Sequence, residues 1–263
     1  MAAPLDPAAT ALARLYDVDL LDDPGDLDLY LALAARADGA ILELGVGSGR
    51  LAVSLAEAGW SVTGVDLDPA MLARARVRAA QAGPEVARRL ELVEADIAGL
   101  RLTGEPARFR LAFIALNSLM LLGDRATQAA AIATLAAHLE PGGMAVVDVW
   151  LPDADDLARY DGRVILEYAR EDPETGRTVV KTGSATHDAA TQTVSLTTIF
   201  DEGAPGEAPV RWIRRDRLRL VGADDLRGFA EAAGLAVEVL AGGYDLEPLG
   251  PGSDRAVLVA TRP

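Results

Sequence analysis

The sequence of 263 residues contains no cysteine, and lysine occurs only once, at Lys181. The lack of cysteine excludes disulfides, thiolate catalysis and zinc sites with sulfur ligands. Basic residues number 25 against 40 acidic ones, for a formal net charge of −15 at pH 7. No basic run is present that could follow a phosphate backbone, so the composition argues against a nucleic-acid partner.

Long apolar runs are also missing. No window reaches the roughly 18 uninterrupted apolar residues that indicate a membrane-spanning helix. The first residues, MAAPLDPAATALARLYD, lack the cationic head and the apolar stretch of a signal peptide. We therefore expect a cytoplasmic protein with no membrane partner. Its hydrophobic content of 50% is enough to bury the core of one large domain.

Hydrophobic periodicity predicts that strands and helices alternate between residues 26 and 150. A short helix is expected over 26–37, and further helices after the first strand, at Asp68–Pro69 and over 124–139. Two more strands follow a helix near the end of the chain. The predicted strands are AILEL, SVTGVD, RLELVEAD, FRLAFIAL, MAVVDVW, LAVEVL and DRAVLVAT. The pattern predicts an α/β fold with a doubly wound, seven-stranded and mostly parallel sheet.

Residues 163–221 break this rhythm with four runs of β character separated by turn sequences, which predict an antiparallel insertion. We therefore expect a core formed by 40–162 and 222–263, and a separate N-terminal helical segment over 1–39. One face of the last inserted strand is apolar, with Trp212, Leu218 and Leu220. A small sheet cannot cover such a face itself, so either the core below or a second copy of the chain should cover it. The insertion is thus expected to be an acceptor lid, a dimer interface or both.

A glycine-rich turn lies between the first strand and its helix, in LELGVGSGR. Such a turn lets the backbone approach a ligand closely and presents free amides at the start of a helix. A dinucleotide-binding loop needs a third glycine at the position that Arg50 occupies. An acidic residue, Asp66, closes the next strand in VTGVD, where its two oxygens suit a ribose diol.

The ordered motifs LELGVGSGR, VTGVDLD, EADI at 94–97 and ALNSLMLL at 115–122 resemble those of the class I S-adenosylmethionine-dependent methyltransferases. The resemblance implies that S-adenosylmethionine is the cofactor and that Asp66 binds its ribose. It also implies that Asn117 and Ser118 lie near the transferred methyl group. The N-terminal segment would close over the cofactor through Tyr16. The implied cofactor-binding residues are Tyr16, Glu43, Gly45, Gly47, Gly49, Asp66, Leu67, Met71, Asp96, Ile97, Asn117 and Ser118.

The sequence contains fewer motifs for the methyl acceptor than for the cofactor, because methyl transfer mainly requires alignment of the two reactants and the exclusion of water. The sequence NSLM replaces the motif typical of enzymes that methylate DNA base amines, so we expect a small-molecule acceptor. Tyr168, Trp212 and Arg214 are candidate acceptor-binding residues, although an aromatic on a strand is more often part of a core. No His, Asp or Glu cluster has metal-ligand spacing.

The general base is not identified by any motif. His187 and Tyr16 are candidates, against the alternatives of a surface histidine beside a turn and of a residue that packs on the first helix. His138 suits the carbonyl end of its helix and is expected to be structural. The leading interpretation is a methyltransferase that acts on N or O of a small metabolite. The alternatives are a non-catalytic cofactor-binding regulator and a nicotinamide-dependent oxidoreductase.

Overall fold

The computed structural model describes residues 5–103 and 108–263, and these divide into two compact units. The core unit consists of Pro24–Leu151 and Val221–Pro263. The sheet unit consists of Met1–Asp23 and Pro152–Leu220. The division assigns the two halves of the predicted N-terminal segment, 1–39, to different units. In the part of the chain that is described, no helix has the length and apolar character that crossing a membrane requires.

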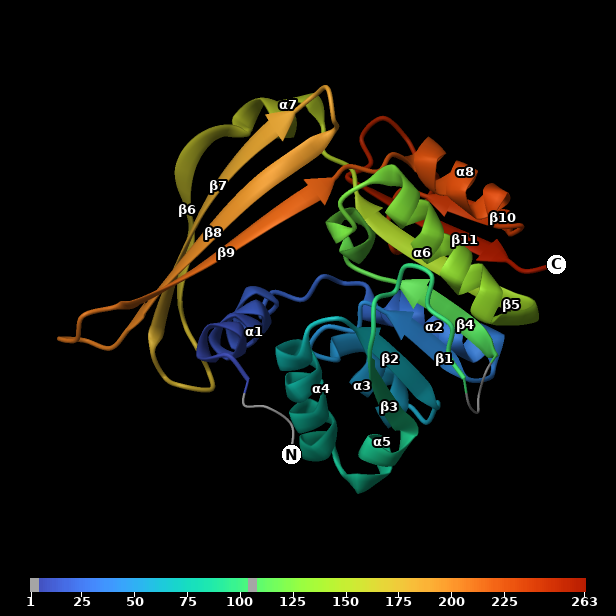
Figure 1. The fold of residues 1–263 in the computed structure, drawn as a ribbon, viewed down its shortest axis with the longest axis horizontal. Helices are drawn as coiled ribbons and strands as arrows, with labels where there is room; N and C mark the ends of the chain where they lie inside the picture. The colour runs from blue at the N-terminus through green and yellow to red at the C-terminus, as the bar shows by residue number, and fades with distance from the viewer. Residues whose placement is uncertain (1–4, 104–107) are drawn as a thin grey trace. The chain divides into compact units, whose positions relative to one another are not determined.

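The core unit is built on a seven-stranded sheet in the order β10-β11-β5-β4-β1-β2-β3 (Figure 1). Strands β1 to β5 pair in parallel, whereas β11 is antiparallel to both β5 and β10. The strands are β1 (Ile41–Leu44), β2 (Val62–Asp66), β3 (Leu90–Glu94), β4 (Phe109–Ile114), β5 (Leu139–Trp150), β10 (Ala236–Ala241) and β11 (Arg255–Thr261). The predicted fold class is confirmed.

Helices cover both faces of this sheet because its strands are apolar on both sides. Residues of α2 and α3 pack with Ile41, Leu111 and Phe113 in one continuous core. On the other face, α6 and α8 lie side by side (Figure 1). The helices of the core unit are α2 (Leu27–Ala37), α3 (Arg50–Glu57), α4 (Pro69–Ala82), α5 (Pro84–Arg89), the 3₁₀ turn η1 (Ser118–Leu121), α6 (Arg125–His138) and α8 (Ala223–Ala232).

The predicted stop at EPGG lies inside β5. The pairing of β4 with β5 shifts register between Phe109 and Leu111, which accommodates the extra residues. Gly142 donates to the carbonyl of Arg262 at 2.7 Å, and the Arg262 amide donates to Gly143 at 2.9 Å. The end of the chain thus extends the ladder across a sequence that alone predicts a turn.

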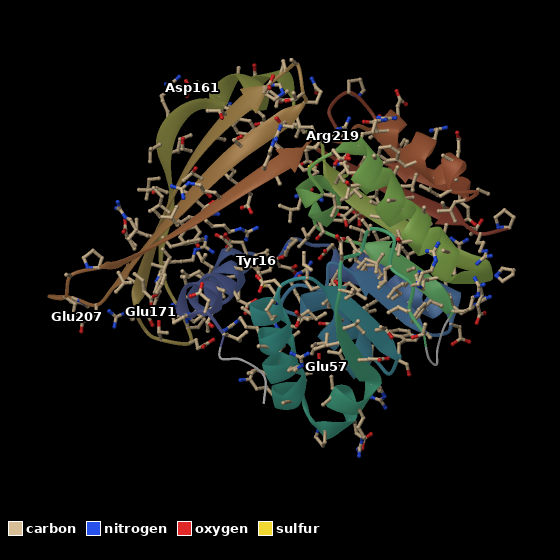
Figure 2. The ribbon with its side chains drawn as sticks, viewed as in Figure 1. Tyr16, Glu57, Asp161, Glu171, Glu207 and Arg219 are labelled. Carbon is tan, nitrogen blue, oxygen red and sulfur yellow. The ribbon has the colours of Figure 1, made fainter. Side chains whose placement is uncertain are left out.

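The sheet unit is an antiparallel sheet in the order β6-β7-β8-β9, as predicted for the insertion. Its strands are β6 (Asp161–Glu171), β7 (Thr178–Asp188), β8 (Thr193–Gly203) and β9 (Val210–Arg219), and its helices are α1 (Pro7–Asp19) and α7 (Ala154–Arg159). Figure 2 labels both ends of β6, Asp161 and Glu171, and the turn residue Glu207 between β8 and β9.

Helix α1 packs on one face of this sheet, which we call the inner face. Leu15 and Val18 of α1 form a core with Val179 and Phe200, and Leu12, Tyr168 and Trp212 pack against it. The apolar face that carries Trp212 was expected to need either the core below or a second copy of the chain. The N-terminal helix α1 packs on this face, and it is neither of the two partners predicted from the sequence.

Candidate active site

The glycine loop joins the carboxyl end of β1 to α3, and its three glycines adopt left-handed backbone. Gly45, Gly47 and Gly49 have φ values of 83°, 53° and 80°. A Cβ atom at Gly45 would lie 3.0 Å from the Ser118 Cβ, and one at Gly49 would lie 3.0 Å from the Ala75 Cβ. Any other residue would therefore strain the backbone and push these neighbours away.

The Asp66 carboxylate lies at the end of β2 beside this loop. One of its oxygens accepts the Gly47 amide at 2.8 Å and the other accepts the Asp68 amide at 2.9 Å. Burial raises the pKa of Asp66, and these two amides oppose the rise. Because each carboxylate oxygen has two acceptor sites, one site per oxygen is left for a ligand. That pair of acceptors matches the two donors of a vicinal diol.

An apolar platform follows Asp66. The Leu67 side chain is 66% exposed, which is unusual for a leucine in a folded core. Strand register pairs Asp66 with Glu94, so Asp96 and Ile97 emerge at the same edge of the sheet. The exposed Asp96 accepts the Ala98 amide at 2.9 Å, and Ile97 is buried. Met71 is half-buried in the first turn of α4. Exposed apolar atoms beside acceptors suit a flat heteroaromatic ring.

Glu43 is a buried acid with an unused oxygen. Its Oε2 atom is shielded from solvent and has no hydrogen-bond partner among the described residues. Burial raises the pKa of Glu43 well above its ordinary value; nearby Asp26 and Asp66 raise it further, and Arg50 lowers it. A buried acceptor without a donor is costly unless a ligand supplies one. A cationic ammonium would satisfy Glu43 in both charge and hydrogen bonding.

Arg50, which displaces the third glycine of a dinucleotide loop, forms a bidentate pair with Asp26. Its two terminal nitrogens contact the Asp26 oxygens at 2.6 Å each, and Asp26 is fully buried before α2. The position of Arg50 in the sequence argues against a dinucleotide but does not predict this pair. The periodicity of α2 gave no sign that its preceding aspartate would meet the glycine-loop helix.

Asn117 and Ser118 form the turn that follows β4. Leu116 and Asn117 have φ values of 48° and 65°, and the Asn117 Oδ1 atom accepts the Trp150 amide at 2.5 Å. Ser118 begins η1 and lies against Gly45. The structure therefore brings together every predicted cofactor-binding residue except Tyr16 at the carboxyl ends of β1 to β4, where ligands bind in open parallel sheets.

A further buried acid, Asp148, is not part of any motif that the sequence shows. It is fully buried in β5 and accepts hydrogen bonds from Tyr30, Tyr244, Arg255 and the Leu116 amide. A lone aspartate in the apolar strand MAVVDVW was the signal that could have identified it. We call Asp148 and these four donors the Asp148 cluster.

The remaining predicted residues belong to the sheet unit. Tyr168 donates to Asp19 at 2.8 Å and Trp212 donates to Glu202 at 3.3 Å, both on the inner face. Arg214 pairs with Asp216 at 2.7 Å. These contacts belong to the packing of α1 and the sheet, so the role of the three residues in acceptor binding stays a prediction.

The two candidate bases also lie in the sheet unit. Tyr16 is half-buried on α1 (Figure 2). His187, near the end of β7, has a buried Nε2 atom without a hydrogen-bond partner among the described residues. Whether either takes a proton stays a prediction. The described residues contain no group of three His, Asp or Glu side chains that could hold a metal.

His138 is structural, as expected, but in a more specific way. It is buried at the end of α6, where its Nδ1 atom contacts the Thr134 carbonyl at 2.8 Å. Its Nε2 atom accepts the Leu102 amide at 3.0 Å. A neutral ring with its proton on Nδ1 satisfies both contacts, so His138 braces the segment before β4.

Comparison with known proteins identifies the core unit. Residues 41–143 match a family model described as a methyltransferase domain. The core unit carries a methyltransferase domain. The resemblance to S-adenosylmethionine-dependent methyltransferases that the motifs indicate is thereby confirmed. No protein with a curated description matches the chain.

Several solved methyltransferase structures resemble the whole chain. The CcbJ methyltransferase from Streptomyces caelestis is 27% identical, with a TM-score of 0.77, over 93% of this chain and 95% of that one. An amino pentose methyltransferase from Micromonospora echinaspora is 22% identical, with a TM-score of 0.69, over 100% and 99%. A sugar N-methyltransferase from Streptoalloteichus is 22% identical, with a TM-score of 0.72, over 100% and 96%. The last two establish similarity of fold, which extends to the antiparallel sheet.

Proposed function

We propose that the chain transfers the methyl group of S-adenosylmethionine to a nitrogen or oxygen atom of a small metabolite. The observation that carries the proposal is the pair of carboxylates at the ends of β1 and β2. Glu43 has a buried oxygen without a partner, and Asp66 keeps two acceptor sites free beside the glycine loop. An ammonium and a ribose diol are the groups that these acids fit.

Different residues of the site would bind different parts of the cofactor. Asp66 would hold the ribose, Glu43 the amino group, and Leu67, Met71 and Ile97 the adenine. When bound, S-adenosylmethionine supplies an electrophilic methyl group on a cationic sulfonium. The acids at the site, Asp26, Glu43 and Asp66, outnumber its guanidinium, Arg50, so the site suits a cationic ligand. The chain's own task is to align donor and acceptor and to exclude water.

For the acceptor, we propose an amine on a small, sugar-like molecule. The similar structures include an amino pentose methyltransferase and a sugar N-methyltransferase, each matched over nearly its whole length. The net charge of −15 also suits an amine better than an anionic acceptor. Tyr168, Trp212 and Arg214 remain the proposed acceptor-binding residues, and His187 and Tyr16 the proposed bases.

The test combines binding with turnover. Calorimetric titration should show S-adenosylhomocysteine binding and no NAD binding. Release of S-adenosylhomocysteine should then be measured across matched amines, alcohols, phenols and carboxylic acids, with amino sugars included. Tight NAD binding would contradict the proposal. Binding without turnover on any acceptor would favour the alternative of a cofactor-binding regulator.

We also propose that two copies of the chain associate through the outer face of the four-stranded sheet, opposite to α1. Strand register places Leu166, Thr182, Ile199 and Ile213 in one row across that face. Leu166 and Ile213 are 63% and 42% exposed, and neighbouring Val164 is 66% exposed. Contiguous exposed apolar side chains of this kind mark interaction surfaces.

A further inference from the structure

Asp148 joins four segments of the core unit through one buried carboxylate. Tyr30 of α2 donates to it at 2.7 Å, Tyr244 after β10 at 3.0 Å and Arg255 of β11 at 2.7 Å. The Leu116 amide lies 3.2 Å from each of its oxygens. No other buried acid among the described residues receives donors from so many elements, and the proposed reaction does not itself use Asp148.

The backbone that Asp148 holds is strained. Leu116 and Asn117 are consecutive residues in the left-handed region, with φ values of 48° and 65°. Asparagine tolerates this conformation, whereas a leucine adopts it only at a steric cost. Such a conformation persists only where neighbouring contacts over-determine it. Here β5 supplies contacts on both residues, because Asp148 accepts the Leu116 amide and Trp150 donates to Asn117.

The strained turn leads directly to the proposed cofactor site. Ser118, the next residue, packs so closely on the glycine loop that a Cβ atom at Gly45 would lie 3.0 Å from its Cβ. A turn that relaxed out of the left-handed region would move Ser118 relative to Gly45. We propose that Asp148 is a positioning residue, an inference that rests on the proposed function. Asp148 holds the Leu116–Ser118 turn against the glycine loop, at the end of the site where the methyl group would lie.

The chemistry of the cluster requires a carboxylate at this position. The Leu116 amide and the Arg255 guanidinium can only donate, and both point at Asp148. An asparagine would keep only one acceptor oxygen for these donors and would place its own NH2 group beside the Leu116 amide, which weakens the hold on that amide. Burial raises the pKa of Asp148, while Tyr30, Arg255, Leu116 and Tyr244 oppose the rise. The donors thus offset the cost of burying the acid.

Asp148→Asn tests the proposal, with Leu226→Ala as the matched control. Leu226 is fully buried in α8, outside the site, so its truncation lowers stability without touching the turn. In Asp148→Asn, we expect the amides of Leu116 to Leu119 to exchange with solvent faster, and S-adenosylhomocysteine to bind on the order of 10-fold more weakly. In Leu226→Ala, the affinity should stay within about twofold at a similar loss of thermal stability.

A rescue variant separates positioning from general stability. Glycine adopts left-handed backbone at no steric cost, so Asp148→Asn combined with Leu116→Gly should regain part of the lost affinity. A purely structural role would make the double variant worse than either single one. Equal affinities in Asp148→Asn and Leu226→Ala would overturn the proposal.

Hydrogen exchange on the unchanged protein decides the case if Asp148→Asn does not fold. The Leu116 amide should then be protected as strongly as those of β4, and rapid exchange would overturn the proposal. The proposed function fails separately, if the unchanged protein binds no S-adenosylhomocysteine. In that event the exchange result still decides whether Asp148 holds the turn.

Discussion

Asp66 has two partners in the protein and room for a third. It fixes the glycine loop through the Gly47 amide and opens the next helix through the Asp68 amide. The motif predicted the acid but not the amides, because a one-dimensional pattern does not show which backbone groups meet it. Glu43 was likewise predicted as a cofactor contact, whereas its burial and unpaired oxygen became visible only in three dimensions.

Substitution of Asp66 should separate its two roles. Asp66→Ala removes the ribose acceptor and also frees two loop amides, so we expect S-adenosylhomocysteine affinity to fall by at least about 1.5–3 kcal/mol. Asp66→Asn keeps one acceptor and should lose less. Glu57→Gln, at the exposed end of α3 and outside the predicted cofactor-binding residues, is the control and should change affinity by under about 0.5 kcal/mol. Calorimetry measures all three, and unchanged affinity in Asp66→Ala would rule out the ribose role.

Glu43 should make cofactor binding depend on pH. Burial raises its pKa in the free protein, and a bound ammonium would stabilise the ionised form and lower that pKa. Binding therefore releases a proton, and affinity should rise with pH until the free carboxylate is already ionised. Calorimetry in buffers of different ionisation enthalpy measures the released proton. In Glu43→Gln the release should vanish; a release that persists would assign it to another group.

At the scale of elements, the sequence predicts the parallel core because hydrophobic residues recur with different periods in strands and in helices. Glycine and proline mark where these elements end. The inserted strands are predicted for the same reason. The packing of α1 on the inner face could not be predicted, because Leu15 and Val18 are far along the chain from Val179 and Phe200. An amphipathic helix shows in sequence that it needs a partner, but not which one.

Shortening a single buried side chain of α1 tests this packing. Leu15 is fully buried, and Leu15→Ala should destabilise the sheet unit by roughly 2–5 kcal/mol through lost burial and a cavity. Leu12→Ala, at a partly buried position of the same helix, is the control and should lower stability less. Amide exchange in β7 and β8 reports the local effect. Equal protection in both variants would mean that α1 contributes little to the stability of the sheet.

At the scale of the whole molecule, charge and the exposed outer face bear on assembly. A net charge of −15 repels a second copy, so association needs a surface where the local charges are favourable. The outer face of the sheet has arginines along β9, at Arg215 and Arg217, and acids at the ends of β6, at Asp161 and Glu171 (Figure 2). A two-fold axis along the strands would place one β9 over the other β6, with opposite charges facing each other.

This arrangement predicts a dimer that Leu166→Asp disrupts. Leu166 lies on β6, at one end of the row that runs through Thr182 and Ile199 to Ile213, and a stable interface of about 1,200–2,000 Å² cannot bury an unpaired carboxylate there. Val77→Asp is the matched control, since Val77 is 56% exposed on α4 of the core unit. Sedimentation velocity should show a dimer for the unchanged chain and for Val77→Asp, and a monomer for Leu166→Asp. S-adenosylhomocysteine affinity should be the same in all three, because neither substitution changes a predicted cofactor-binding residue. A monomer for the unchanged chain at micromolar concentration would refute the interface, and a dimer in Leu166→Asp would move it to another surface.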